Sequence, residues 1–242
     1  MKQITAYLAF VLAAAFALSP AFTSPFTGFT EDQLPIPQIN PPVQPAGYAF
    51  AIWGLIYLWL IVSGLFGAIK RAKADDWHRA RLPLIVSLAV GVPWLAIANA
   101  SAIWATITIW VMAGSAVLAL LRAPFRDRWL FQAPVGLYAG WLTAASCVSL
   151  ATVMAGYGIG PKAAGWAVAA IGLAFVLAWS VHRRRRNAPE YLAAVIWALV
   201  GIVLANWATD GFVALLAGIG AMVLFIRALS SPQEDPPIGL YR

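Results

Sequence analysis

The chain alternates between long stretches without any charged residue and short segments that carry nearly all of the charges. A helix needs about 20 mostly apolar residues to cross a bilayer. Each uncharged stretch is therefore predicted to hold at least one transmembrane helix. The seven stretches are Gln3–Thr30, Gln33–Ile69, Leu82–Leu121, Trp129–Pro161, Ala163–His182, Tyr191–Thr209 and Gly211–Ile226.

One of these stretches is too long for a single crossing. Leu82–Leu121 contains 40 residues, which would form a helix about 60 Å long at 1.5 Å per residue. The hydrocarbon core of a bilayer is only about 30 Å thick. We therefore expect two helices joined by a tight turn near Asn99–Ser101, and eight transmembrane helices in all.

The basic residues support this count. Cytoplasmic loops of membrane proteins collect Lys and Arg. With eight helices and Lys2 inside, 15 of the 16 basic residues fall on the cytoplasmic side and only Lys162 falls outside. A single helix over 82–121 would divide the basic clusters between the two faces. We therefore expect both termini in the cytoplasm and a multi-pass protein of a bacterial cytoplasmic (inner) membrane.

The composition agrees with this fold class. Hydrophobic residues make up 62% of the chain and charged residues 10%, and the mean hydropathy is +0.80, whereas a soluble domain has roughly 25% charged residues. These values exclude a cytosolic or secreted enzyme, a coiled coil and a disordered tail. The net charge of +7 sits in clusters between apolar stretches, so it does not indicate nucleic-acid binding. The predicted fold is an all-α polytopic membrane helix bundle.

The N-terminal stretch has two interpretations. Lys2, the apolar run after it and the small residues of 17–21 fit a cleaved signal peptide. They also fit a first transmembrane helix, which is the interpretation adopted here.

Residues 23–47 are predicted to form the one long loop outside the bundle. The loop is rich in proline and lacks Lys and Arg, which predicts an ordered segment without helix because proline fixes φ and removes an N–H donor. Loops of this length are uncommon unless they are functional or disordered. We interpret the segment as a lid over the mouth of the bundle, and a plain spacer is the alternative.

The sequence contains few groups that could carry catalysis or bind a metal. It has no P-loop and no HExxH motif, and Gly156–Gly160 is interpreted as a turn because no strand precedes it. His78 and His182 lie at predicted helix ends, and the single Cys147 allows no thiolate cluster. Asp210 is the acidic residue nearest to the membrane interior, and it falls in a predicted turn, which disfavours an ion-coupled pump. We expect no cofactor, no metal and no enzyme activity.

Tryptophan is unusually frequent, with 12 in 242 residues. Membrane proteins place Trp at the two interfaces, and Trp77, Trp104, Trp129 and Trp207 fit that explanation. The other eight lie within predicted spans, where an indole needs a hydrogen-bond partner or a flat partner surface. They are either packing residues or the lining of a cavity for a flat apolar ligand, in which case Trp53, Trp94 and Trp141 are the central candidates.

The segment around Trp53 carries the most distinctive motif. Residues 45–57 read PAGYAFAIWGLIY. This run resembles the start of the second helix in the TspO/MBR family, the tryptophan-rich sensory proteins that include the translocator protein (peripheral benzodiazepine receptor). Pro45, Trp53 and Tyr57 keep the spacing of the family motif.

Two further motifs match the same family in part. Its third helix carries Leu-Asn-x-x-Trp, where this chain keeps Trp94 but has Gly91 in place of the asparagine. Its fifth helix carries Pro-Tyr-x-x-Trp with an asparagine eight residues after the Trp. Here Tyr138 and Trp141 are present, and Ser149 stands at the asparagine position.

The resemblance implies a ligand pocket beneath the first loop, where family members are thought to bind porphyrins, sterols and synthetic ligands. Because Gly91 offers no side chain and Ser149 a shorter one, we expect a more apolar pocket. Porphyrin carboxylates need cations nearby, and the outer face offers only Lys162. The residues that the resemblance assigns to the ligand are Pro45, Trp53, Tyr57, Trp94, Tyr138, Trp141 and Ser149.

The resemblance also suggests how the chain is divided. Residues 1–156 correspond to the five-helix unit of the family, residues 157–229 form a three-helix extension typical of its longer members, and residues 230–242 form a cytoplasmic tail. Gly136 and Gly140 make a GxxxG spacing on the fifth helix, which lets helix backbones approach closely. This spacing is explained either by packing within the bundle or by a homodimer seam.

The function implied by the resemblance is that of a membrane receptor or carrier without enzyme activity. Its ligand would be flat and hydrophobic, such as a tetrapyrrole (porphyrin) or a sterol-like lipid, and its role regulatory. One alternative is a facilitator that transports a small apolar metabolite and uses the extension as a second gate. The other is a porphyrin-degrading enzyme with Trp53 and Trp141 as redox-active aromatics.

Overall fold

The computed structural model describes residues 1–230, and every regular element in this range is a helix. The predicted all-α class is therefore confirmed. Short 3₁₀ turns occur in the connections. The nine α-helices are α1 Lys2–Leu18, α2 Ile52–Lys70, α3 Asp75–Gly91, α4 Trp94–Ala100, α5 Ala102–Leu121, α6 Gln132–Gly156, α7 Ala163–Arg184, α8 Pro189–Asn206 and α9 Gly211–Leu229.

The helices account for the predicted membrane crossings. Seven are long and apolar enough to span a bilayer, and there are eight when the bent pair of α3 and α4 is counted as one span. The predicted turn near 99–101 is confirmed at Ser101, where α4 ends and α5 begins. Ser101 has extended backbone, and its Oγ accepts a hydrogen bond from the N–H of Trp104. This hydroxyl satisfies one of the free N–H groups at the start of α5.

A second break in this region was not predicted. The chain bends by 42° between α3 and α4, at Val92 and Pro93. Proline has no N–H, and its ring clashes with the carbonyl four residues earlier, so a helix kinks or ends there. The bend turns α4 away from the axis of α3 and brings Trp94, its first residue, under the 23–47 loop.

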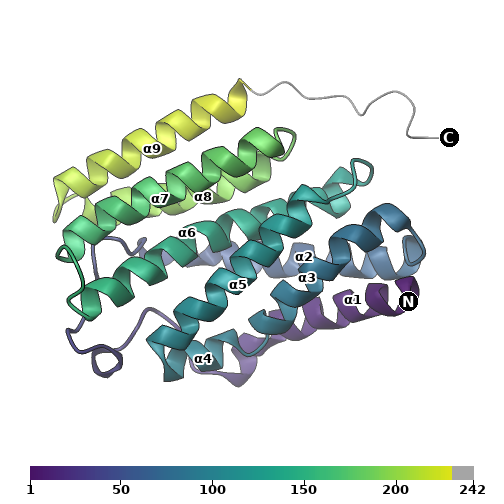
Figure 1. The fold of residues 1–242 in the computed structure, drawn as a ribbon, viewed down its shortest axis with the longest axis horizontal. Helices are drawn as coiled ribbons and strands as arrows, with labels where there is room; N and C mark the ends of the chain where they lie inside the picture. The colour runs from purple at the N-terminus through teal and green to yellow at the C-terminus, as the bar shows by residue number, and fades with distance from the viewer. Residues whose placement is uncertain (231–242) are drawn as a thin grey trace.

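The central helix of the bundle is α6. It lies between α5, α3, α2 and α1 on one side and α7, α8 and α9 on the other (Figure 1). Of its 25 residues, 20 are buried. A Cβ on Gly140 would lie 2.1 Å from the backbone oxygen of Tyr191 in α8, and Gly136 also faces Tyr191. The GxxxG spacing is thus used for packing within the chain, and the homodimer stays a prediction.

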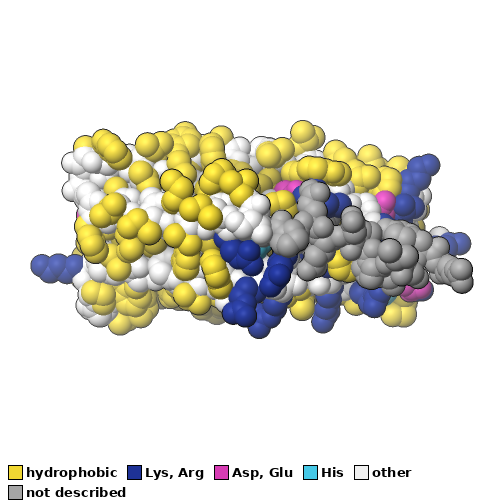
Figure 2. All heavy atoms as spheres, turned by 90° about the horizontal axis from the view of Figure 1, so that it is seen from above, with side chains coloured by type: hydrophobic (Ala, Val, Ile, Leu, Met, Phe, Trp, Pro, Cys, Tyr) yellow, Lys and Arg dark blue, Asp and Glu magenta, His cyan; other side chains and the backbone are white. Residues whose placement is uncertain are grey.

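The two ends of the bundle differ in composition. The lid end holds the connection of residues 19–51, and the basic end holds the loops of residues 71–74, 122–131 and 185–188 (Figure 1). Within residues 1–230, the basic residues other than Lys162 lie in or beside the loops and chain terminus of the basic end. Figure 2 shows most Lys and Arg side chains over the middle and right of the molecule, and one at its left end, with apolar surface between.

Candidate functional site

A cavity of about 310 Å³ lies at the lid end. Side chains of α1, α2, α4, α5, α6 and α8 form its walls, and the connection before α2 covers it. The residues predicted from the sequence meet here from separate elements. Six of the seven line the cavity: Pro45, Trp53, Tyr57, Trp94, Trp141 and Ser149.

Stacked and edge-on rings form one wall of the cavity. Trp53 and Tyr57 lie one turn apart on α2, and their rings stack with centroids 5.2 Å apart at 21°. The ring of Trp141 meets Trp53 edge-on at 6.3 Å, and that of Phe16 does so at 5.7 Å. Because each ring contacts its neighbour in a stacked or edge-on geometry that aromatic pairs favour, the wall is preformed.

Tyr138, the seventh predicted residue, lies behind this wall. It is fully buried in α6, and its ring is 6.4 Å from that of Trp53 and 5.8 Å from that of Phe16. Its hydroxyl lies 2.9 Å from Oγ of Ser87, which donates to the carbonyl of Met112. Tyr138 therefore supports the aromatic wall and does not line the cavity.

Several donors that line the cavity have no partner in the protein. Among the described residues, the indole N–H groups of Trp53 and Trp141 and the hydroxyl of Tyr57 make no hydrogen bond. The N–H of Trp94, by contrast, donates to the carbonyl of Ala105 at 3.0 Å. These three donors are not among the buried atoms that lack a partner, so they are accessible to water or to a ligand in the cavity.

Ser149 offers the cavity an acceptor and no donor. Its Oγ is 2.6 Å from Oγ1 of Thr106, and Thr106 already donates its only hydroxyl proton to the carbonyl of Ala102. The Ser149 hydroxyl must therefore donate to Thr106, and its free lone pairs remain for a ligand.

The cavity carries no charge. None of the described residues around it is acidic or basic. An ionised carboxylate placed there would lose its hydration without gaining a cation, which is strongly unfavourable. The volume falls at the lower end of ligand pockets, which span about 300–1,000 Å³. The site suits a compact, uncharged and largely apolar molecule.

Sequence reasoning missed several residues that line the cavity. Phe26 and Phe29 of the lid, Phe50 before α2, Phe16 of α1 and Ala198 of α8 all contribute. The two phenylalanines in a proline-rich loop were a usable signal, because such a loop buries them only against the bundle. Ala198 gave no signal, since alanine is common in every span.

Position 91, where the family motif has asparagine, is a glycine here, and neighbouring side chains fill the space beside it. A Cβ at this position would lie 3.0 Å from the ring of Phe16 and 3.1 Å from the methyl of Met112. The Phe16 ring therefore occupies the space that a larger side chain at 91 would need. Position 91 therefore brings no polar side chain to the cavity, and a pocket more apolar than that of the family stays a prediction.

The lid is an ordered part of the fold. The side chain of Gln33 donates to the carbonyl of Ala98 at 2.8 Å, and Asn99 donates to the carbonyl of Ser24 at 3.0 Å. Leu34 packs so closely on α6 that a Cβ on Gly156 would lie 2.7 Å from it. These contacts fit a cover over the cavity better than a plain spacer.

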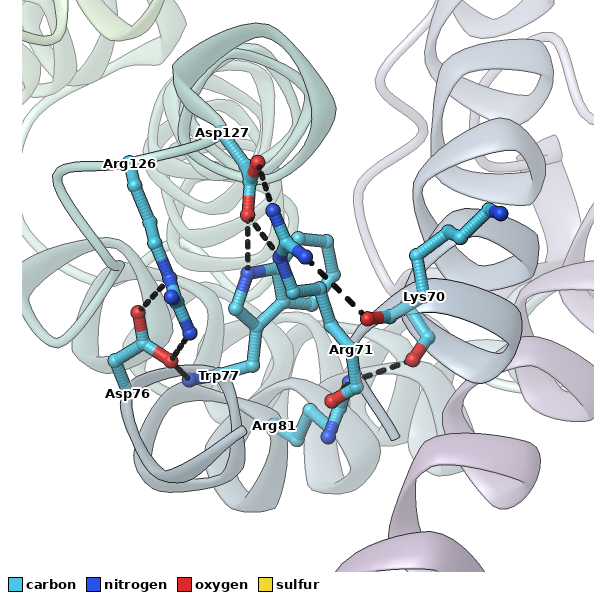
Figure 3. Close-up of polar contacts among 8 residues, drawn as sticks. Lys70, Arg71, Asp76, Trp77, Arg81, Arg126 and Asp127 are labelled. Carbon is cyan, nitrogen blue, oxygen red and sulfur yellow. Dashed lines mark hydrogen bonds and ion pairs between the residues drawn. The ribbon is translucent and has the colours of Figure 1, made fainter. Parts of the chain in front are cut away.

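A second polar cluster lies at the basic end (Figure 3). Arg71 donates to both carboxylate oxygens of Asp127, at 2.7 and 3.0 Å, and the indole of Trp77 donates to the same group at 3.1 Å. Burial alone would raise the pKa of Asp127, but the hydrogen bonds from Arg71 and Trp77 outweigh it and lower that pKa below its ordinary value. The cluster joins the ends of α2 and α3 to the loop before α6.

The other members of this cluster are also paired within the protein. Arg126 forms an ion pair with Asp76 at 2.6 Å, and the buried Arg81 donates to the carbonyls of Gly67 and Arg71 at 2.9 and 2.8 Å (Figure 3). The space beside them holds a cavity of only about 10 Å³, enough for about one water molecule. This arrangement is a clamp between helix ends and lacks room for a larger ligand.

Comparison with known proteins gives one match. The family model described as TSPO-like protein matches residues 3–230. The matched range runs through all nine helices, including α7, α8 and α9. No curated protein and no solved structure matches the chain.

Proposed function

Because the chain belongs to the TSPO-like protein family, we propose that this multi-pass integral membrane protein is a receptor or carrier for a flat, hydrophobic and uncharged ligand. We further propose a bacterial cytoplasmic membrane as its location, with the basic end in the cytoplasm, following the bias of basic residues. The ligand lies against the Trp53–Tyr57 stack beneath the lid.

The observation that carries the proposal is the cavity itself, which combines an aromatic wall, unpaired donors and no charge. A planar ring system gains stacking and edge contacts with Trp53 and Trp141, at roughly 1 kcal/mol for each aromatic contact beyond the buried area. A single oxygen on the ligand can accept from an indole N–H or from Tyr57. These features favour a neutral sterol-like lipid over a tetrapyrrole that carries free carboxylates.

The experiment compares ligands that differ only in charge. Purified protein in detergent is titrated with protoporphyrin IX, with its dimethyl ester and with the fluorescent sterol dehydroergosterol, and quenching of or energy transfer from tryptophan is measured. We expect the ester to bind at least tenfold more tightly than the diacid, and the sterol to bind as well. Absence of binding by both neutral probes would contradict the proposal.

Transport is the second candidate function, because a lid that covers a cavity also suits a carrier. Flux of dehydroergosterol between donor liposomes and liposomes that contain the protein separates the two roles. A receptor binds without increasing flux, whereas a facilitator increases it. For the porphyrin-degrading alternative, the described lining residues include no carboxylate, Lys or His that could serve in acid–base catalysis. Product analysis in light and darkness tests that alternative.

A further inference from the structure

Helix α8 reaches the cavity although it lies in the C-terminal part of the chain. Its Ala198 is 1% exposed and lines the cavity together with side chains of α1, α2, α4, α5 and α6. No other described α8 residue lines it. The methyl group of Ala198 is therefore the part of α8 that borders the cavity among the described residues.

The same face of α8 holds the strap, defined here as residues 42–49, which leads into α2. Asn206 donates through Nδ2 to the carbonyl of Pro42 at 2.8 Å. The carbonyl of Gly201 accepts from the N–H of Ala46 at 3.0 Å. The indole of Trp197 donates to the carbonyl of Ala49 at 2.8 Å. Three contacts spaced along α8 thus fix both ends and the middle of the strap.

Close packing leaves the strap no room to move towards α8. A Cβ on Gly201 would lie 2.9 Å from Cβ of Pro45 and 3.0 Å from Cβ of Ala49. Pro45 itself lines the cavity, so its position depends on this contact. Nearer its N-terminus, the same face of α8 packs on Gly140 of α6, where a Cβ would lie 2.1 Å from the carbonyl oxygen of Tyr191, and the opposite side of α8 packs on α9. The wall at Ala198 is therefore held between the contact with α6 and the contact with the strap, with α9 behind it, and cannot retreat from a larger ligand.

We propose that α8 determines the size of ligand that the cavity accepts, with Ala198 as the specificity-determining residue and Gly201 as a positioning residue for the strap. This inference rests on the proposed function. A rigid, closely packed wall excludes ligands that are too large for the cavity, because packed protein interiors tolerate extra methylene groups poorly. A larger side chain at 198 should exclude large ligands first and leave small ones nearly unaffected.

The test uses the full chain in detergent and two neutral probes of different size, pyrene and the larger dehydroergosterol. Binding of each is measured by energy transfer from tryptophan. We expect Ala198→Phe to weaken sterol binding tenfold or more, within the range of about 10–200-fold by which an apolar pocket discriminates small volume changes. Pyrene binding should change less than threefold. The matched control, Ala193→Phe, is on the exposed face of α8 and should change neither.

The outcomes separate this inference from the proposed function. If the wild-type chain binds neither probe, the proposed function fails and this inference fails with it. If the wild-type chain binds both and Ala198→Phe weakens both equally or neither, the inference alone is overturned. Ala198→Val decides the question if the Phe variant does not fold, with an expected loss of about tenfold for the sterol only.

The role of Gly201 has its own readout. Gly201→Ala should push Pro45 and the strap, and so lower the ratio of sterol to pyrene affinity. A purely structural role would lower the melting temperature and leave this ratio unchanged.

Discussion

The lid end and the basic end differ in how their polar groups are paired. At the basic end, the carboxylates of Asp75, Asp76, Asp127 and Glu190 each pair with a Lys or Arg, and the remaining space is about 10 Å³. At the lid end, two indole N–H groups and a phenol have no partner among the described residues, beside a cavity of about 310 Å³. Ion pairs make the basic end a clamp, although the buried Nη1 of Arg81 and Oε2 of Glu190 have no partner there among the described residues. Open space and accessible donors mark the lid end as a place for a ligand.

The largest expected effect breaks the clamp. Asp127→Ala leaves Arg71 and the Trp77 indole without their acceptor, and removal of the charged partner from this partly buried pair costs about 2 kcal/mol. Unfolding of the detergent-solubilised protein, followed by circular dichroism, measures the loss. Asp32→Ala, on the exposed lid, is the matched control and should cost under about 0.5 kcal/mol. Probe affinity should stay the same in both variants, and a loss of binding in Asp127→Ala would show that the two ends are coupled.

The same carboxylate predicts a pH dependence. The folded state lowers the pKa of Asp127, so its contribution to stability is complete above the ordinary carboxylate pKa of about 4 and is lost as the pH falls through the lowered value. We expect stability to fall below pH 4 in the wild type and less steeply in Asp127→Asn. Equal slopes for the two proteins would remove Asp127 from the acid response.

The next prediction concerns the Trp53–Tyr57 stack at the lid end. Trp53→Ala should weaken binding of dehydroergosterol tenfold or more, because it deletes a flat contact surface and its N–H, and tenfold corresponds to about 1.4 kcal/mol. Trp179→Ala is the control, since Trp179 stacks on Phe175 away from the cavity and should leave affinity unchanged. Equal losses in both variants would mean that tryptophan serves only for packing.

Sequence patterns carried strong signals for some of this arrangement and none for the rest. Gaps between charges and the positive-inside bias predicted the spans, and the four-residue spacing of Trp53 and Tyr57 placed both on one face of α2. Phe16 and Ala198 could not be predicted in the same way. In a membrane helix both the buried and the lipid-facing sides are apolar, so hydrophobic periodicity does not show which alanine or phenylalanine points inward. Pro93 was a signal for the break, but proline alone does not decide it, because Pro83 lies inside α3 without ending that helix.

A further prediction concerns a variant that loosens the lid and leaves the aromatic wall unchanged. Asn206→Leu removes the hydrogen bond to Pro42, a loss of about 1 kcal/mol, and should increase the dissociation rate of dehydroergosterol several-fold. Stopped-flow displacement measures this rate. Asn187→Leu, the same substitution at the basic end, is the control, because the Asn187 side chain makes no hydrogen bond with described residues. An unchanged rate in Asn206→Leu would show that the lid does not limit ligand release.

The smallest expected effect concerns Ser149. Its hydroxyl donates to Thr106, so Ser149→Ala removes only an acceptor from the cavity. We expect sterol affinity to change less than threefold, by the same titration, because a hydroxyl on the ligand can turn to another acceptor. Ser146→Ala, one turn earlier on α6 and bonded to backbone carbonyls, is the control. A tenfold loss in Ser149→Ala alone would mean that the ligand donates specifically to this oxygen.

The strap also has a consequence for how the protein is made. Its partners on α8 lie far downstream, since 148 residues separate Ala49 from Trp197 and 164 separate Pro42 from Asn206. At a synthesis rate of about 5–20 residues per second, the ribosome needs roughly 8–30 s to produce the second partner after the first. Late in that interval the nascent chain contains the tryptophans of α2, α4 and α6 but still has no α8 against which to seat the strap. The finished cavity therefore forms only when the late helices arrive in the membrane.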